Sequence, residues 1–144
     1  MTSITETQKK FLLSPEFAIL GASKDSTKTG SKLLQWYISH GKTVTPAHPK
    51  EEVLAGIPTV KKLSDLSSPQ QTSLSIVTPP KITLGALQEA ETSRIPYIWI
   101  QPGAEDAAVI ELIDNSEYLK ARTVYGGPCI LASGDEILGL KSSL

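Results

Sequence analysis

Short apolar runs alternate with longer amphipathic stretches along most of the chain. The first run, from Phe17 to Leu20, is uninterrupted and ends at Gly21, which is typical of a strand buried on both faces of a parallel sheet. From Gly30 the apolar residues recur at helical spacing, and Gly41 ends that pattern. The helical stripe consists of Leu33, Leu34, Tyr37 and Ile38. With a second strand at 43–47, these segments form a strand–helix–strand unit of about 30 residues.

The same alternation continues toward the C-terminus. Further strands are predicted at 74–77, 97–100 and 123–125, with a short extended piece at 56–60. Helices are predicted at 81–93 and 105–115, with shorter helical segments at 6–13 and 63–66. After Gly126 the pattern favours neither type of element. We therefore predict an α/β fold: a Rossmann-like, doubly wound, mostly parallel sheet of about five strands with helices on both faces.

The length of 144 residues fits one domain. No repeat, linker or low-complexity segment divides it. We expect an N-terminal extension over 1–11, followed by a single domain over 12–144. The apolar fraction of 40% is ordinary for a globular chain.

Charge and targeting signals narrow the possible partners. With 14 basic and 15 acidic residues, the net charge of -1 argues against general binding of nucleic acid or a membrane surface. No apolar run approaches the ~20 residues of a membrane span. The first residues lack the apolar core of a signal peptide, and one cysteine, Cys129, excludes an internal disulfide. We expect a cytoplasmic protein, with the nucleus as the alternative.

Ligands of doubly wound sheets bind beyond the carboxyl ends of the strands, so the loops at those ends are the candidate sites. In the first loop, Gly21 permits close approach of a backbone to a phosphate, and Gly30 opens a helix whose free N–H groups attract anions. Hydroxyl groups and lysines are frequent in this loop and in the helix start that follows it: Ser23, Lys24, Ser26, Thr27, Lys28, Thr29, Ser31 and Lys32. The composition favours phosphate binding; the alternative is a solvated surface loop.

The end of the second strand bears on which nucleotide would bind. The chain lacks both G-x-G-x-x-G and the phosphate loop of nucleotide triphosphatases. Dinucleotide binders place an acidic residue here for the ribose hydroxyls, but this chain has Ala47-His48-Pro49-Lys50 and no carboxylate until Glu51. Lys50 and His48 instead favour a phosphorylated ribose. NADP or coenzyme A is therefore favoured over NAD.

Four motifs in order carry a resemblance to a known family. They are FAILGAS with its delayed helix-opening glycine, VTPAHPK at the second strand end, VTPP at the third and WIQPGA at the fourth. Together they resemble the coenzyme A-binding domain family, the small stand-alone relatives of the N-terminal domain of the succinyl-coenzyme A synthetase alpha subunit. The resemblance covers roughly residues 12–132 and implies a Rossmann-type fold whose first loop cradles the phosphates of coenzyme A.

The resemblance also implies which residues bind the cofactor, loop by loop. The phosphate loop matches Gly21, Ala22, Ser23 and Lys24, and its helix start matches Thr29 and Gly30. The loop at the nucleotide end matches His48, Pro49 and Lys50. Thr78, Pro79 and Pro80 line the adenine or pantetheine path, and Gln101, Pro102 and Gly103 flank the pantetheine arm.

Catalytic and metal-binding signals are weak in this chain. The ligase relatives carry a phosphorylated histidine in a further domain, and neither His40 nor His48 is placed like it. Stand-alone members often have Cys-Pro near the last strand, whereas this chain has Pro128-Cys129. Cys129 is interpreted as a small buried residue, the alternative being thiol exchange with coenzyme A. Two histidines and one cysteine are too few for a usual structural zinc site. We predict neither catalytic nor metal-ligating residues.

Three functions remain open at this point. The first is a binding module for coenzyme A or acyl-coenzyme A, with a small nucleotide as its ligand. The second is an NAD(P)-linked oxidoreductase, although no Tyr-x-x-x-Lys pair supplies a proton-transfer group. The third is an orphan ligase-like subunit that acts with a partner chain. A shared fold does not choose among them.

Overall fold

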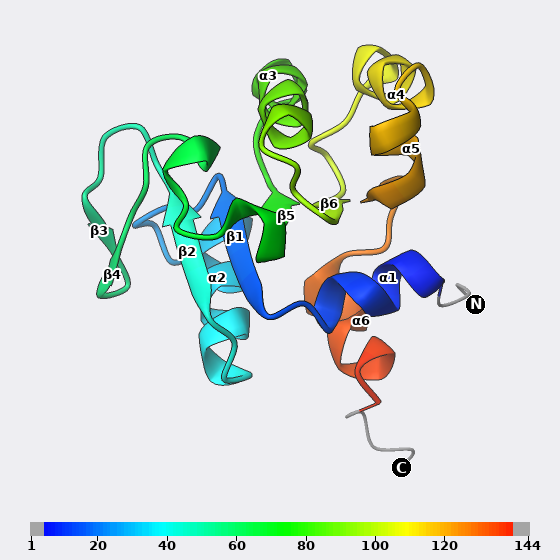
Figure 1. Ribbon diagram of the computed structural model, residues 1–144. Coiled ribbons are helices and arrows are strands. Elements are labelled where there is room, and N and C mark those ends of the chain that lie inside the picture. Colours follow the sequence, from blue (N-terminus) through cyan, green and yellow to red (C-terminus); the bar gives the residue numbers. More distant parts are fainter. Residues whose placement is uncertain (1–4, 140–144) are drawn as a thin grey trace.

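A five-stranded parallel sheet forms the centre of the protein, with helices on both faces (Figure 1). The computed structural model describes residues 5–139. The strand order is β2-β1-β5-β6-β7, and every neighbouring pair is parallel. The strands are β1 (Glu16–Leu20), β2 (Val44–Ala47), β5 (Thr72–Ile76), β6 (Ile98–Ile100) and β7 (Thr123–Val124). This arrangement confirms the predicted fold class.

Six α-helices and two 3₁₀ turns connect the strands in the described part of the chain. They are α1 (Glu6–Leu12), α2 (Thr29–Ser39), η1 (Leu63–Asp65), η2 (Pro69–Gln71), α3 (Pro80–Thr92), α4 (Ala107–Asp114), α5 (Glu117–Arg122) and α6 (Ile130–Ile137). Side chains cap several of their N-termini. Thr5 and Gln8 form a reciprocal capping box on α1. Asp106 accepts a hydrogen bond from the Val109 N–H at the start of α4.

The structure differs from the predicted elements in three places. The helix predicted over 105–115 is followed by a second one, α5, because Ser116 caps a new helix. The stretch after Gly126, which favoured neither element, contains α6. The extended piece predicted at 56–60 is part of an antiparallel hairpin, β3 (Val53–Leu54) with β4 (Ile57–Pro58), beside the sheet. The predicted domain end at residue 144 and the first four residues lie outside the described range.

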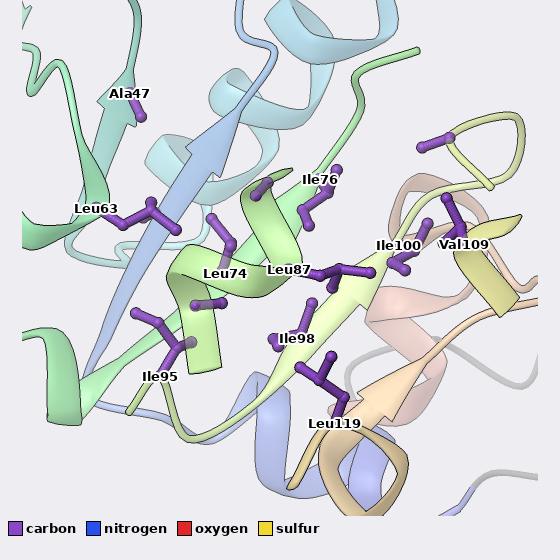
Figure 2. Close-up of a cluster of buried hydrophobic side chains, with 14 of the residues drawn as sticks. Ala47, Leu63, Leu74, Ile76, Leu87, Ile95, Ile98, Ile100, Val109 and Leu119 are labelled. Carbon is purple, nitrogen blue, oxygen red and sulfur yellow. The ribbon is translucent and has the colours of Figure 1, made fainter. Parts of the chain in front are cut away.

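Two apolar layers hold the helices to the sheet. On one face, side chains of α3, α4 and α5 pack against the inner strands; Figure 2 shows Leu87 of α3 close to Leu74 and Ile98. On the other face, α1, α2 and α6 pack around Phe17, Ile19 and Trp99. Trp99 is fully buried, and its Nε1 donates a hydrogen bond to the Pro128 carbonyl at 2.9 Å. Ile38, predicted to lie on the buried stripe of α2, is 39% exposed.

The order of the strands creates one crevice at the carboxyl edge of the sheet. From β1 the chain crosses to β2 on one side, and from β2 it crosses back to β5 on the other side of β1. The helices that follow β1 and β5, α2 and α3, therefore lie on opposite faces of the sheet, which leaves a crevice at its carboxyl edge between the two strands. The first loop, 21–28, and the turn at 77–79 meet there. No helix within residues 5–139 is both long and apolar enough to cross a membrane.

Candidate functional site

The first loop begins with a backbone turn that requires glycine. Gly21 follows β1 with φ +107°, a conformation that side-chain-bearing residues rarely adopt. A Cβ at Gly21 would lie 2.6 Å from Val77 Cγ2 and 2.9 Å from the Val77 carbonyl carbon. The start of the first loop is thus pressed against the end of β5.

The first loop also closes tightly on the start of α2. A Cβ added to Gly30 would collide with the Gly21 carbonyl oxygen and would lie 3.0 Å from Ala22 Cα. These neighbours are backbone atoms, so they cannot swing aside as the end of a long side chain can. The sequence therefore needs glycine at both positions, and the loop returns to the β1 terminus before α2 begins.

Among residues 5–139, no side chain caps the N-terminus of α2. Lys28 occupies the N-cap position and makes no side-chain cap hydrogen bond. The first N–H groups of an α-helix have no partner within the helix, and the helix dipole favours an anion beside them. An eleven-residue helix that begins in this way offers a place for a phosphate group.

Charge in the first loop is predominantly positive. Lys24, Lys28 and Lys32 are exposed, and Asp25 is the single acidic residue among them. The Asp25 carboxylate accepts hydrogen bonds from the hydroxyl and the backbone N–H of Thr27, at 2.6 and 2.9 Å. These bonds, with Lys28 nearby, lower the pKa of Asp25. Asp25 is thus charged at neutral pH, and it shapes the loop while offsetting one of the three cations.

A cavity of about 260 Å³ lies where three of the predicted loops meet at the carboxyl edge. Its walls come from the start of α2, the end of β5 and the loop after β6. The lining residues are Thr29, Val77, Thr78, Pro79, Pro102, Gly103 and Ala104. Five of the fifteen predicted ligand residues are therefore brought together here. Val77 and Ala104 were not predicted, because nothing in an apolar residue at a strand end distinguishes a cavity wall from core.

The turn after β5 is fixed by its own hydroxyl groups. Thr78 Oγ1 and Thr83 Oγ1 lie 2.9 Å apart, and Thr83 Oγ1 also donates to the Pro79 carbonyl at 3.2 Å. Both threonines are buried. Pro80 is the first residue of α3, where its missing N–H has no cost. The main role of Thr78 is therefore to fix the shape of the wall of the 260 Å³ cavity.

A second cavity of about 320 Å³ lies on the other side of the first loop. The hairpin β3–β4 and the first turns of α2 form its remaining walls. The lining residues are Ser23, Lys24, Ser26, Ser31, Leu34, Gln35, Val53, Leu54 and Ala55. The side chain of Val53 is 53% exposed at this cavity. Ser23 and Lys24 were predicted site residues. The hairpin residues were missed because a two-residue strand has no measurable period.

At the end of β2, His48 acts on the backbone of its own turn. His48 Nδ1 accepts hydrogen bonds from the N–H groups of Lys50 and Glu51, at 3.0 and 2.9 Å. Because Nδ1 is an acceptor in both bonds, the ring proton lies on Nε2. His48 thus holds the turn that presents Lys50 and Glu51, while Nε2 remains a donor. Pro49 and Lys50 are exposed in the same turn.

An ion pair joins this turn to the first loop. Lys24 Nζ lies 3.1 Å from Glu51 Oε2, and the Lys24 side chain is 69% exposed. Lys24 therefore reaches the turn that follows β2. Sequence reasoning had noted Glu51 only as the first carboxylate after β2, and no spacing rule would have paired it with Lys24.

Gln101 behaves differently from the other predicted residues of its loop. Its side chain is 1% exposed, and its Oε1 accepts a hydrogen bond from the Ile130 N–H at 3.2 Å. Within the described part of the chain, Gln101 Nε2 has no hydrogen-bond partner. Gln101 therefore ties the loop after β6 to the start of α6 and does not line the 260 Å³ cavity. Cys129, half-buried, occupies the N-cap position of α6.

The two histidines do not form a reactive group with the cysteine. His40 stacks on Trp36 with ring centroids 3.9 Å apart, and its Nε2 lies 2.5 Å from Asp135 Oδ1. This contact ties the end of α2 to α6. Within residues 5–139, no three His, Cys, Asp or Glu side chains are grouped to hold a metal ion. The arrangement at the carboxyl edge offers small-residue walls, backbone donors and lysines, which are means of binding an anionic ligand.

Comparison with solved structures gives the same fold in proteins of similar size. A conserved hypothetical protein from Pyrococcus furiosus is 27% identical, with a TM-score of 0.71 over 82% of this chain and 97% of that chain. A Thermus thermophilus protein is 22% identical, with a TM-score of 0.77 over 92% and 99%. An acetyl-coenzyme A synthetase from Ca. Korarchaeum cryptofilum, solved with phosphate and ADP, is 24% identical, with a TM-score of 0.69. This chain is similar to only 27% of that larger enzyme.

Sequence comparison identifies the family. No curated protein matches the chain. A family model described as a CoA binding domain matches residues 15–135, which include β1, the first loop and both cavities. The resemblance identified from the four motifs is confirmed. The chain belongs to the coenzyme A-binding domain family.

Proposed function

We propose that this protein binds coenzyme A or an acyl-coenzyme A at the carboxyl edge of its sheet, as a binding module without a catalytic group of its own. The observation that carries the proposal is the tight closure of the first loop on α2. That closure leaves the uncapped start of α2 beside a cavity lined by Thr29. Membership of the coenzyme A-binding family supplies the ligand class.

The shape of the site suits an elongated ligand with phosphates near its middle. The diphosphate would lie at the start of α2, where N–H groups without a helical partner and Lys28 offset its charge. The pantetheine arm would enter the 260 Å³ cavity, whose walls are mostly proline and small residues. The adenosine would lie toward the 320 Å³ cavity, where Val53 offers exposed apolar surface.

The proposal is tested by calorimetric titration of the purified protein with coenzyme A, NADP and NAD, after mass spectrometry for a ligand retained during purification. Coenzyme A should bind in the micromolar range and more tightly than NADP or NAD. Binding of NADP alone would replace the proposal with an oxidoreductase-like site. No binding of any of the three would favour a subunit that acts through a partner chain.

A charge reversal locates the site without weakening the fold. Lys28→Glu places a carboxylate at the N-cap of α2, where the helix dipole favours it but where it repels a phosphate. Reversing one charge near the diphosphate should weaken binding by about tenfold or more. Lys10→Glu makes the same change of charge on α1, near the opposite edge of the sheet, and serves as the control. Equal affinity of the Lys28→Glu and Lys10→Glu variants would place the phosphates elsewhere.

A further inference from the structure

The ion pair between Lys24 and Glu51 lies on the ribose side of the proposed site. In Rossmann-type sheets the ribose of the nucleotide is held at the end of the second strand. Glu51 belongs to the turn after β2, and Lys24 reaches it from the first loop with 3.1 Å between Nζ and Oε2. Lys24 is therefore placed to meet a group on the ribose, while Lys28 stands closer to the start of α2.

Glu51 is held in position by its backbone. Its N–H donates to His48 Nδ1 at 2.9 Å, and its carbonyl accepts a hydrogen bond from Thr59 Oγ1 at 2.5 Å. The turn after β2 and the segment after β4 thus fix it from both sides. Exposed ion pairs contribute little to stability, so the pairing of Glu51 with Lys24 adds little to the stability of the fold. It does keep a negative charge beside Lys24.

We propose that Glu51 is a specificity residue that competes with a phosphate on the ligand's ribose for Lys24; this inference rests on the proposed function. Coenzyme A carries a 3′-phosphate on its ribose, and dephospho-coenzyme A has a free hydroxyl there. A 3′-phosphate that takes Lys24 must break the ion pair and remain near the Glu51 carboxylate. A ribose hydroxyl has no such conflict and can donate a hydrogen bond to that carboxylate. Glu51 therefore lowers the ratio of the affinity for coenzyme A to the affinity for dephospho-coenzyme A.

The other charged residues near the turn do not take part in the pairing between Lys24 and Glu51. Lys50, in the same turn, is exposed, and within residues 5–139 it forms no ion pair. The Asp25 carboxylate accepts hydrogen bonds from Thr27. Glu52 carries the same charge as Glu51 one residue further on and is exposed, but it is not paired with Lys24. Lys24 is the cation that Glu51 neutralises.

The test measures the affinities of coenzyme A and dephospho-coenzyme A for the parent, Glu51→Gln and Glu52→Gln by calorimetry at low salt. Glu51→Gln should raise the affinity for coenzyme A about threefold to tenfold, because one repulsive charge is removed and Lys24 is released. It should leave the affinity for dephospho-coenzyme A within about twofold. Glu52→Gln changes the net charge equally and should alter the ratio of the two affinities by less than about twofold.

A second variant identifies the cation. Lys24→Met should lower the affinity for coenzyme A, and adding Glu51→Gln to it should raise that affinity by less than Glu51→Gln does alone, because only the repulsion from the carboxylate remains to be relieved. The inference would be overturned if Glu51→Gln left the ratio of the affinities for coenzyme A and dephospho-coenzyme A unchanged. It would also be overturned if Glu52→Gln changed that ratio as much as Glu51→Gln does. Either result would leave coenzyme A binding by the parent intact. Failure of the parent to bind either ligand would overturn the proposed function, and the inference with it.

Discussion

Because the first loop closes tightly on α2, we expect Gly30→Ala to destabilise the protein, the opposite of the usual effect of replacing a helical glycine with alanine. Alanine normally stabilises a helix interior relative to glycine by about 0.5–1 kcal/mol, because it loses less backbone entropy on folding. At Gly30 the added methyl group would collide with the Gly21 carbonyl oxygen and would lie 2.9 Å from its carbon. Forcing a methyl group into a closed backbone contact costs about 1–3 kcal/mol. We expect Gly30→Ala to be destabilised by roughly 1–2 kcal/mol.

Gly85 provides a matched control on the other face of the sheet. It lies within α3, and no atom lies within 4 Å of a Cβ built there. Gly85→Ala should therefore follow the ordinary rule and stabilise the protein by about 0.5–1 kcal/mol. The two variants make the same chemical change and should move stability in opposite directions. Urea unfolding measures both, with the slope of the transition checked for constancy.

Binding gives an independent check of the same geometry. Gly30→Ala must separate the first loop from α2, which should lower the affinity for coenzyme A by about tenfold, equivalent to ~1.4 kcal/mol. Gly85→Ala should bind like the parent. If Gly30→Ala is as stable as Gly85→Ala, the loop relaxes freely and the tight closure is wrong. If Gly30→Ala is destabilised but binds coenzyme A normally, the closure contributes to the stability of the fold and not to ligand binding.

Three further substitutions probe the packing of the protein interior. Gly134→Ala should destabilise the protein by about 1–3 kcal/mol and alter tryptophan fluorescence, because the new methyl group would collide with the Trp36 indole between α2 and α6. Thr123→Val should be neutral or should stabilise by up to about 1 kcal/mol in urea unfolding, because Thr123 Oγ1 is buried and finds no hydrogen-bond partner among residues 5–139. Burial raises the pKa of Tyr37 above its usual 10.0 despite the hydrogen bond to Ser75. The unfolded chain then loses this proton first, so stability is full below pH 10.0 and falls as pH rises beyond it. Tyr37→Phe should flatten that fall in unfolding measured between pH 9 and pH 11, while costing about 1–3 kcal/mol at neutral pH because Ser75 Oγ loses its buried partner.

The alternation of elements was predictable because burial imposes a period on the sequence. The run from Phe17 to Leu20 is apolar because β1 is covered on both faces, and this is visible without any structure. α6 was not visible in this way. Its buried residues are only Ile130 and Gly134, and Gly134 is buried because it lies against Trp36, a long-range contact that local propensity does not encode.

The candidate site was predictable in its loops but not in its side-chain directions. The rule that ligands bind at the carboxyl ends of parallel strands selected the loops that hold Thr29, Thr78 and Pro102, and these do meet in one cavity. It gave no means of knowing that Gln101 turns inward to the Ile130 N–H. That direction depends on α6, which follows Gln101 by about thirty residues and had itself escaped prediction.

Lys24 shows most clearly why a loop's composition does not fix its chemistry. From the sequence it is one of three lysines near a phosphate-binding helix start, and all three would be assigned to the same phosphate. In the folded chain it is paired with Glu51, whose own position depends on His48 and on Thr59 after the β3–β4 hairpin. In the proposed complex, this acidic residue would direct Lys24 to the ribose, while Lys28 would remain beside the diphosphate. Replacing that acid with glutamine should therefore change the ratio of the affinities for coenzyme A and dephospho-coenzyme A more than it changes nucleotide binding in general.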